Sequence, residues 1–414
     1  MQQPDKTTGR TALLVAAFDS QLKWCARIRD ELVARGFSCE AVVPDARSAL
    51  SPQQVLDAGF EEVRHLPWTT LVDDALSYDV VVISLAGPLT QRLSIELALA
   101  SESAQGPGPV VVSGWVGIIF ERITAGYLDR CGTDVIAVNS ADDLDHFRHT
   151  ADRLGLPSHN LFLTGLPFLS SSPAPVRVGP IRKVLYADQP TVPATAFERR
   201  YVYGRLIEYA RAHPGREVLL KPRHRPEEDT FHRMKHHPAD LLPDIGLPPN
   251  FRLDYTPITE SLPEVDLLLT MSSTACLEAI DFGSRVGLIA DLGVNERYGN
   301  QVFLDSGLLR TFDLITADDI GDVEPDWRES YFGGRDRLPT QVLVDRVEEL
   351  LDTGSRPSRD VWSSAYFRSS TELHRARQAA QPAWMSSPWK LRVVQAARPW
   401  TPPIIVRTVR RRLS

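Results

Sequence analysis

The segment Asp266–Ile289, DLLLTMSSTACLEAIDFGSRVGLI, carries the pattern that decides the fold class. An apolar run ends in Met271–Thr274, an amphipathic helical segment follows, and a second apolar run begins after Gly283, which we interpret as the helix stop. Both runs are apolar throughout rather than alternating, which is typical of a parallel sheet covered by helices on both faces. The segment therefore predicts an α/β fold, and it raises the question of why hydroxyl residues gather where a strand meets a helix.

The same alternation of strand and helix extends in both directions from this segment. Ala12–Phe18 predicts a buried strand, and Ser20–Gly36 predicts a helix with its cap near Ser20 and its end at Gly36. A second series of apolar runs begins at Lys183, after a segment rich in Ser and Pro that is typical of a linker. These patterns predict two doubly wound, Rossmann-like domains that face a cleft. The predicted divisions are a first domain over residues 1–169, a linker over 170–180, a second domain over 181–355, and C-terminal helices with a basic tail over 356–414.

Length and composition limit the classes of protein to which the chain can belong. Its 414 residues exceed a single ordinary core, and with 43% hydrophobic and 24% charged residues both domains can bury cores of their own. The net charge of -7 argues against a dedicated nucleic-acid binder. The N-terminus lacks the pattern of a signal peptide, and no apolar run reaches the roughly 18 residues of a membrane-spanning helix. We therefore expect a cytoplasmic protein.

The cysteines and the C-terminus add two further expectations. Cys25, Cys39, Cys131 and Cys276 show neither CxxC pairing nor the histidine spacing of a zinc site, so we expect reduced thiols and no metal. The basic tail, residues 387–414, combines tryptophan and aliphatic side chains with many Lys and Arg residues. It fits either peripheral attachment to an anionic membrane surface or a final helix with a solvated basic face. Its prolines argue against one continuous helix.

Cationic residues follow an apolar strand in the predicted second domain. Lys221, Arg223, His224 and Arg225 lie in the sequence KPRHRP, directly after the apolar run VLL. Arg offers planar bidentate donors to a phosphate and Lys a compact charge, while His can donate to a phosphate oxygen or help a phosphate leave. The carboxyl end of this strand therefore predicts an anion site. The alternative is a solvated basic loop that is neutralised by the acidic residues after it, Glu227, Glu228 and Asp229.

The hydroxyl residues Ser272, Ser273 and Thr274 have two interpretations. Each can accept from a backbone N–H group of the following helix, which is ordinary capping. The same helix end offers N–H groups and a positive dipole to a ligand phosphate. Glu278 follows near the first turn, where its carboxylate can take a ribose hydroxyl or complete a capping interaction. Taken alone, this segment leaves both interpretations open.

Together, the KPRHRP loop and the SSTACLEA segment resemble the second domain of glycosyltransferases with the GT-B fold. Within that fold they are most similar to bacterial surface-polysaccharide enzymes, namely sialyltransferases and polysialyltransferases with His-Pro and Ser-Ser/Thr motifs, and capsule β-Kdo transferases. The sequence YADQP, Tyr186–Pro190, resembles a Gln-Pro element that opens the second domain in some of these enzymes. Actinobacterial proteins described only as glycosyltransferases are the nearest relatives that we expect. The resemblance is specific from about Lys183 to Leu309, and for the first domain it extends to architecture alone.

This resemblance implies roles for individual residues. His224 is expected to contact the donor phosphate, and Glu278 is expected to face the ribose. Arg225 separates His224 from Pro226, whereas the family's His and Pro are adjacent, so Arg223 or Arg225 can take over the role of His224. The hydroxyl turn is expected to hold phosphate or nucleotide. The expected donor-binding residues are Gln189, Lys221, Arg223, Arg225, Ser272, Ser273, Thr274 and Glu278.

Transfer to an acceptor hydroxyl also needs a base, which we expect from the first domain. Asp19 follows the first strand, where a base would face the cleft, although N-capping of the next helix explains it equally well. Glu121 is the other candidate, because Gly114 and Gly117 before it would let the backbone approach a ligand closely. Trp115 can stack on a sugar or lie in the core, and we favour the core. The spacing does not decide between Asp19 and Glu121.

The sequence thus predicts a metal-independent glycosyltransferase without a cofactor, since cations and a helix dipole can neutralise the leaving phosphate. It moves a sugar from a CMP- or UDP-activated donor to a glycan or lipid-linked acceptor in surface-polysaccharide synthesis, with inversion. The alternatives are a CDP-polyol phosphotransferase of the teichoic-acid type and a non-catalytic nucleotide-binding subunit. The expected catalytic residues are Asp19, Glu121 and His224.

Overall fold

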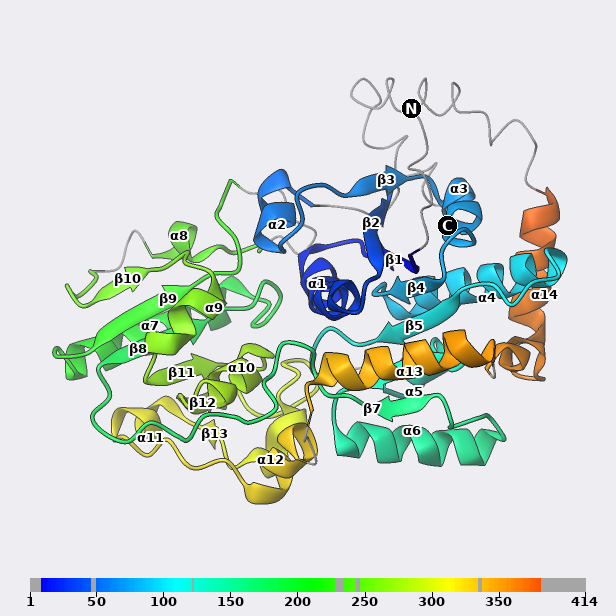
Figure 1. The fold of residues 1–414 in the computed structure, drawn as a ribbon. Coiled ribbons are helices and arrows are strands. Elements are labelled where there is room, and N and C mark those ends of the chain that lie inside the picture. The colour runs from blue at the N-terminus through cyan, green and yellow to red at the C-terminus, as the bar shows by residue number, and fades with distance from the viewer. Residues whose placement is uncertain are drawn as a thin grey trace.

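The computed structural model contains two β-sheets, which Figure 1 shows side by side with helices around each. Strands β1 to β7 form the first sheet, and β8 to β13 form the second. The predicted α/β fold with two doubly wound, Rossmann-like halves is therefore confirmed. The structure describes residues 9–45, 50–120, 123–227, 234–242, 246–333, 337–356 and 358–380.

The first sheet has seven strands in the order β3-β2-β1-β4-β5-β6-β7, and its recorded pairings are all parallel. Central strands such as β4 are buried on both faces, which explains why their sequences are apolar throughout. The direction in which strands are added reverses between β1 and β4. The strands are β1 (Thr11–Val15), β2 (Ser38–Pro44), β3 (Arg64–Leu66), β4 (Val80–Ile83), β5 (Val110–Gly114), β6 (Val135–Val138) and β7 (Leu161–Leu163).

The helices of the first half include the predicted helix after the first strand. This helix, α1, begins at Asp19, one residue before the expected start, with Phe18 as its N-cap. Its chain then turns at Gly36, whose φ of 85° suits glycine. The helices of this half are α1 (Asp19–Ala34), α2 (Pro52–Asp57), α3 (Trp68–Ala75), α4 (Gly87–Ser103), α5 (Ile123–Leu128) and α6 (Ala141–Leu154).

The second sheet has six strands in the order β10-β9-β8-β11-β12-β13, again with parallel pairings. Here the direction of strand addition reverses between β8 and β11. The predicted stop at Gly283 is confirmed, because α10 ends at Asp281 and Gly283 has a φ of 75°. The strands are β8 (Lys183–Ala187), β9 (Glu217–Lys221), β10 (Phe251–Leu253), β11 (Leu267–Thr270), β12 (Arg285–Ile289) and β13 (Leu309–Arg310), and the helices are α7 (Ala196–Ala212), α8 (Pro238–Leu241), α9 (Ile258–Ser261), α10 (Ala275–Asp281), α11 (Phe312–Thr316) and α12 (Pro325–Phe332).

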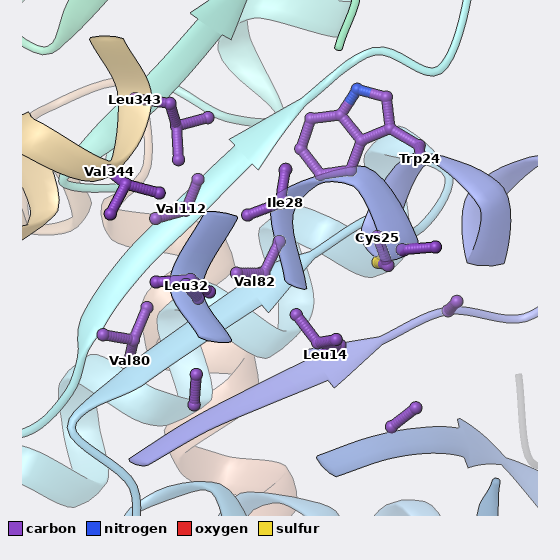
Figure 2. Packing of buried hydrophobic residues seen from close by; sticks show 14 of the residues in the cluster. Leu14, Trp24, Cys25, Ile28, Leu32, Val80, Val82, Val112, Leu343 and Val344 are labelled. Atoms are coloured by element: carbon purple, nitrogen blue, oxygen red, sulfur yellow. The ribbon is translucent and has the colours of Figure 1, made fainter. Parts of the chain in front are cut away.

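The chain returns to the first sheet at its C-terminal end (Figure 1). Helix α13 (Pro339–Thr353), which the sequence analysis counted with the second domain, packs into the core of the first. Figure 2 shows Leu343 and Val344 of α13 in the same cluster as Leu32 of α1 and Val112 of β5. Helix α14 (Arg368–Ala380) then lies against α4. The first half is therefore built from both ends of the chain.

The linker between the two sheets is bound to the second one. The side chain of Asp281, at the end of α10, accepts from the backbone N–H and the hydroxyl of Ser170, at 3.0 Å and 2.6 Å. The backbone N–H groups of Ala174 and Arg177 donate to the carbonyls of Asp281 and Gly283, at 2.9 Å and 2.8 Å. Although its Ser and Pro content is typical of a free linker, this segment is held along α10.

Two further expectations concern membranes and metals. Within the ranges given above, no helix is long and apolar enough to cross a membrane. The same residues contain no group of three or more His, Cys, Asp or Glu side chains placed to hold a metal ion. The basic tail, residues 387–414, lies outside the described residues, so its membrane contact stays a prediction.

Candidate active site

Four loops leave the carboxyl ends of adjacent strands in the second sheet and contain the polar motifs noted in the sequence. They follow β9, β8, β11 and β12, which lie side by side in that order. Doubly wound sheets bind ligands beyond this edge, where the direction of strand addition reverses. That point lies here between β8 and β11. The loops after these two strands therefore hold the expected ligand position.

The loop after β8 is held by a buried ion pair that the sequence analysis missed. Arg199 of α7 donates from Nη1 to both carboxylate oxygens of Asp188 at 3.0 Å. Its Nη2 donates to the carbonyls of Gln189 and Pro190, at 2.6 Å and 2.9 Å. The hydroxyl of Tyr203 donates to Asp188 at 2.5 Å. Because both charges are buried, loss of either would leave its partner uncompensated.

Gln189 connects the loop after β8 to the turn after β11. Its Oε1 accepts from the backbone N–H of Ser272 at 3.0 Å, and its Nε2 donates to the Ser272 hydroxyl at 3.2 Å. That hydroxyl donates to the carbonyl of Tyr298 at 2.6 Å, in the loop after β12. The Tyr298 hydroxyl donates in turn to Glu198 of α7 at 2.9 Å. The structure thus brings together two residues expected at the donor, Gln189 and Ser272, and uses both side chains to join three loops.

The other two hydroxyl residues of the turn make different contacts. Ser273 Oγ accepts from the backbone N–H of Ala275 at 3.3 Å, at the start of α10. Thr274 occupies the N-cap position, but its side chain makes no capping hydrogen bond. Its Oγ1 accepts instead from the backbone N–H of Ile118 at 3.2 Å, in the first half of the molecule. Contact with the helix terminus therefore explains Ser273, whereas Thr274 links the turn to the first domain.

His224 lies inside the loop after β9 rather than on its surface. Its Nε2 accepts from the backbone N–H of Met234 at 3.0 Å, which places the ring proton on Nδ1. Nδ1 donates to the carbonyl of Arg225 at 2.7 Å, and the His224 carbonyl accepts from Nε2 of His237 at 2.9 Å. The ring is 4% exposed. In this conformation both ring nitrogens hold the shape of the loop, and neither is left for a phosphate.

Arg223, the preceding cation, reaches across to the first domain. Its Nη2 donates to Oδ2 of Asp19, the first residue of α1, at 2.9 Å. Burial alone would raise the pKa of Asp19, but the positive charges of Arg223 and Lys23 outweigh it and hold the pKa below its usual value. Asp19 is therefore ionised at neutral pH. Phe18 is the N-cap of α1, so Asp19 stands in the first turn of the helix, and its carboxylate pairs with Arg223 across the domain interface.

The two remaining cations of this loop, Lys221 and Arg225, differ in their surroundings. Lys221 ends β9, is partly buried, and its carbonyl accepts from the backbone N–H of Asp188 at 2.9 Å. The Arg225 guanidinium is exposed and lies over the ring of Tyr255, 4.6 Å from its centroid. A cation stacked on a ring keeps the edge of its guanidinium for an anion. Both cations lie at the carboxyl end of β9, where the sequence predicted an anion site.

The carboxylate of Glu278 lies in a cationic environment formed by both domains. Burial raises its pKa to about 7, against the positive charges of Lys23 and Arg27 of α1 and of Arg223. A carboxyl group with a pKa near neutrality can accept or release a proton at working pH. Glu278 lies one turn after Thr274 on α10, and its contact with a ribose, which the resemblance implies, stays a prediction.

The first-domain segment after β5 contained the other expected groups. Glu121 lies outside the described residues, so its role as a base stays a prediction. Trp115 packs against the core, with the Arg130 guanidinium 4.4 Å from its ring, which confirms the core interpretation. A Cβ added at Gly114 would lie 2.8 Å from Cζ2 of Trp24. Gly114 thus permits close packing inside the first domain rather than approach to a ligand.

A sequence signal for Arg199 did exist. Arg199 is spaced three, four and seven residues from Val202, Tyr203 and Leu206, all of them on the buried face of α7. An arginine on an apolar stripe needs a buried carboxylate partner, and Asp188 precedes it at the end of a strand. Tyr298 gave no such signal, because it contacts Ser272 through a backbone carbonyl.

The fold agrees with that of solved two-domain proteins of the GT-B class. The UDP-GlcNAc 2-epimerase from Neisseria meningitidis, bound to UDP-GlcNAc, is similar with a TM-score of 0.54 and 11% identity, covering 82% of this chain and 100% of that one. UGT89C1 of Arabidopsis thaliana, complexed with UDP, gives 0.53 and 12%, with 84% and 100% covered. The S. aureus MnaA-UDP structure gives 0.52 and 10%, with 83% and 97% covered. Identities this low show the fold alone.

The sequence itself defines the family more closely. A family model described as "Putative glycosyltransferase (DUF6716)" matches residues 12–350, so the chain belongs to this family. The match spans both sheets and most of α13. Comparison with curated proteins gave no match.

Proposed function

We propose that the chain is a glycosyltransferase that uses a nucleotide-activated sugar as its donor. The donor phosphate binds at the carboxyl edge of the second sheet, between Arg223 and Arg225 on one side and the Ser273 turn on the other. The acceptor hydroxyl approaches from the first domain, on the side of Asp19. This arrangement gives the donor to the second domain and the acceptor to the first.

The observation that carries this proposal is the contact between Arg223 and Asp19. It places a cation of the expected donor site 2.9 Å from a carboxylate of the other domain. Glycosyl transfer needs both groups, because positive charge stabilises the leaving phosphate and a carboxylate takes the acceptor proton. Family membership supports the reaction class, and the solved structures of similar fold hold UDP or UDP-GlcNAc.

Competition for Arg223 couples donor binding to catalysis. A donor phosphate draws Arg223 away from Asp19, so the carboxylate loses one of the two positive charges that lower its pKa, and the pKa rises under the effect of burial. Asp19 becomes a stronger base as the donor binds. The acceptor oxygen attacks the anomeric carbon while its proton passes to Asp19, and the bond to the phosphate oxygen breaks with its electron pair on the phosphate. A single displacement of this kind inverts the anomeric configuration.

The test is a donor panel assayed with the full chain. UDP-, CDP-, CMP- and GDP-activated sugars are supplied, and released nucleotide is measured with and without oligosaccharide acceptors. We expect one nucleotide class to turn over, and Asp19→Asn to abolish the turnover while the protein keeps its melting temperature. The anomeric configuration of the product, measured by NMR, checks inversion. Failure of every donor class to turn over would contradict the proposal.

The alternatives give different results in the same assay. A product that retains donor phosphorus indicates a polyol phosphotransferase, and tight nucleotide binding without turnover indicates a non-catalytic subunit. We also propose a glycan or lipid-linked acceptor in surface-polysaccharide synthesis, following the resemblance to sialyl- and Kdo-transferases. Flotation with anionic vesicles, compared with zwitterionic ones, tests whether the basic tail brings the enzyme to a membrane.

A further inference from the structure

A short first-domain segment, Gly117–Phe120, enters the second domain at the hydroxyl turn. Ile118 belongs to the same buried cluster as Leu277 of α10 and Phe303 of the second half. Its neighbour Ile119 belongs instead to a cluster of the first half. Consecutive side chains thus anchor the segment in both cores. Any movement of one domain against the other must therefore change the contacts of this segment.

Two polar contacts fix this segment between the domains. On the first-domain side, Asn139 Nδ2 donates to the carbonyl of Gly117 at 2.8 Å. On the second-domain side, the backbone N–H of Ile118 donates to Thr274 Oγ1 at 3.2 Å, and Gln301 Nε2 donates to the carbonyl of Phe120 at 3.0 Å. The segment therefore carries an unbroken set of contacts from the end of β6 to the turn after β11.

Gly117 makes this contact sterically possible. A Cβ at Gly117 would lie 2.6 Å from Thr274 Oγ1, which is closer than real Cβ contacts, and 3.5 Å from Thr274 Cβ. Thr274 cannot easily turn aside, because its branched side chain has few χ1 rotamers and turning it would remove the acceptor of the Ile118 N–H. Any side chain at position 117 must therefore push the two domains apart or displace the turn.

We propose that Gly117 is a positioning residue for the transfer reaction. Because it has no side chain, the first domain seats its backbone on Thr274 when the domains close, and this contact sets the turn that holds the donor phosphate. The inference rests on the proposed function, since it names how the same site is assembled. Domain closure of this kind completes a catalytic constellation without contributing a reacting group.

A suppressor experiment tests this role. In Gly117→Ala, kcat falls roughly 10- to 100-fold, because small misplacements of reacting groups have effects of this size, while the Kd for free nucleotide changes less than about threefold. Thr274→Ala removes the atom that clashes, and the remaining contact to Cβ at 3.5 Å is ordinary. The double variant Gly117→Ala/Thr274→Ala is therefore expected to recover part of the kcat lost in Gly117→Ala, because the clash is removed while the Ile118 N–H still lacks its acceptor.

The matched control is Gly204→Ala on α7, where an added Cβ meets nothing within 4 Å. It keeps the wild-type kcat. Small-angle scattering gives a second readout that needs no turnover: Gly117→Ala has a larger radius of gyration than the wild type, and the double variant does not. Thr274→Val, which keeps the side-chain shape and removes only the acceptor, serves if Gly117→Ala does not fold, and it lowers kcat with unchanged nucleotide Kd.

The outcomes separate this inference from the proposed function. Unchanged kcat and radius of gyration in Gly117→Ala, or no recovery in the double variant, would overturn the positioning role. A wild-type protein that turns over no donor contradicts the proposed function, and the positioning role in transfer fails with it. In that case a larger, suppressible radius of gyration still identifies Gly117 as the residue that permits domain contact.

Discussion

The loop Lys221–Pro226 and the turn Met271–Thr274 follow β9 and β11, the two strands that flank β8 in the second sheet. Their polar groups nevertheless make different contacts. The loop contacts the first domain through a charge, because Arg223 Nη2 donates to the carboxylate of Asp19. The turn contacts it through a neutral hydroxyl, Thr274, that accepts from a backbone N–H. The comparison teaches that the first contact suits ligand exchange, whereas the second suits fixed geometry.

Each element also commits one polar residue to its own architecture. His224 holds the loop through both ring nitrogens, and Ser272 holds the turn through Gln189 and the Tyr298 carbonyl. The residue with the clearest motif match in each element is therefore structural in this conformation. The residues next to them make the other contacts. Arg223 and Thr274 contact the first domain, and Ser273 contacts the start of α10.

The largest expected effect is the loss of activity on removal of the Arg223 side chain. Arg223→Ala lowers kcat/KM roughly 100- to 1000-fold, because a preorganised cation at the developing negative charge is lost. The melting temperature changes little, since the Arg223 side chain is 40% exposed and exposed ion pairs stabilise weakly. Steady-state kinetics and calorimetry on one preparation check both statements. The control is Arg252→Ala, which removes an exposed cation on β10. Wild-type kinetics in Arg223→Ala would show that Arg223 has no role in transfer.

For His224 we expect the opposite, a loss of stability with little change in kcat. His224→Ala leaves the Met234 N–H and the Arg225 carbonyl without partners and opens a cavity, so the free energy of unfolding falls by about 2–4 kcal/mol. The fraction that stays folded keeps kcat within about tenfold of the wild type, since both ring nitrogens are bound to backbone groups of the loop. Urea denaturation and kinetics on the same sample measure the two effects. A stable His224→Ala protein without activity would restore a direct role at the phosphate.

A smaller effect tests the bond between the loops after β8 and β11. Gln189→Ala and Ser272→Ala each destabilise the protein, and because the two side chains share hydrogen bonds their effects are not additive. We expect a coupling energy of about 1 kcal/mol in the double-mutant cycle. Urea denaturation of the four proteins measures it. Additive effects would show that the two side chains do not act together.

An effect of similar size, confined to neutral and higher pH, concerns Glu278. Its folded-state pKa of about 7 lies above the ordinary value of 4.5, so ionisation opposes folding as pH rises from 4.5 through 7. Glu278→Gln therefore stabilises the protein by about 1–2 kcal/mol at pH 8 and changes little near pH 4.5. Melting temperatures across this range check the sign. Destabilisation by Glu278→Gln at pH 8 would mean that Lys23, Arg27 and Arg223 hold the carboxylate ionised.

The fold was predictable because its signals are local. The apolar runs that became β11 and β12, and the helix between them, follow from periodicity and from the stop at Gly283. A parallel sheet places the carboxyl ends of all its strands at one edge. The sequence alone could therefore predict that the loop Lys221–Pro226 and the turn Met271–Thr274 lie at the same edge. The return of α13 to the first sheet was not predictable, since an amphipathic helix does not specify which core it covers.

The partners of the polar side chains depend on contacts that no local pattern contains. Arg223 and Asp19 are 204 residues apart, and Thr274 and Ile118 are 156 residues apart. The resemblance pointed to these two segments and to His224, while the inserted Arg225 was the sequence sign that the loop geometry differs from the family pattern. Gly117 was noted in the sequence as a point of close approach. The structure shows that what approaches is Thr274 of the other domain rather than a ligand.

Calorimetric titration with nucleotides measures most directly whether a phosphate binds at Arg223. The full chain is titrated with UDP, CDP, CMP and GDP, together with Arg223→Ala and the Arg252→Ala control. We predict that at least one nucleotide binds the wild type, and that its Kd rises about tenfold or more in Arg223→Ala, equivalent to about 1.4 kcal/mol. The control should bind as the wild type does. Equal affinity in Arg223→Ala, or no binding of any nucleotide, would contradict a donor site at this edge of the second sheet.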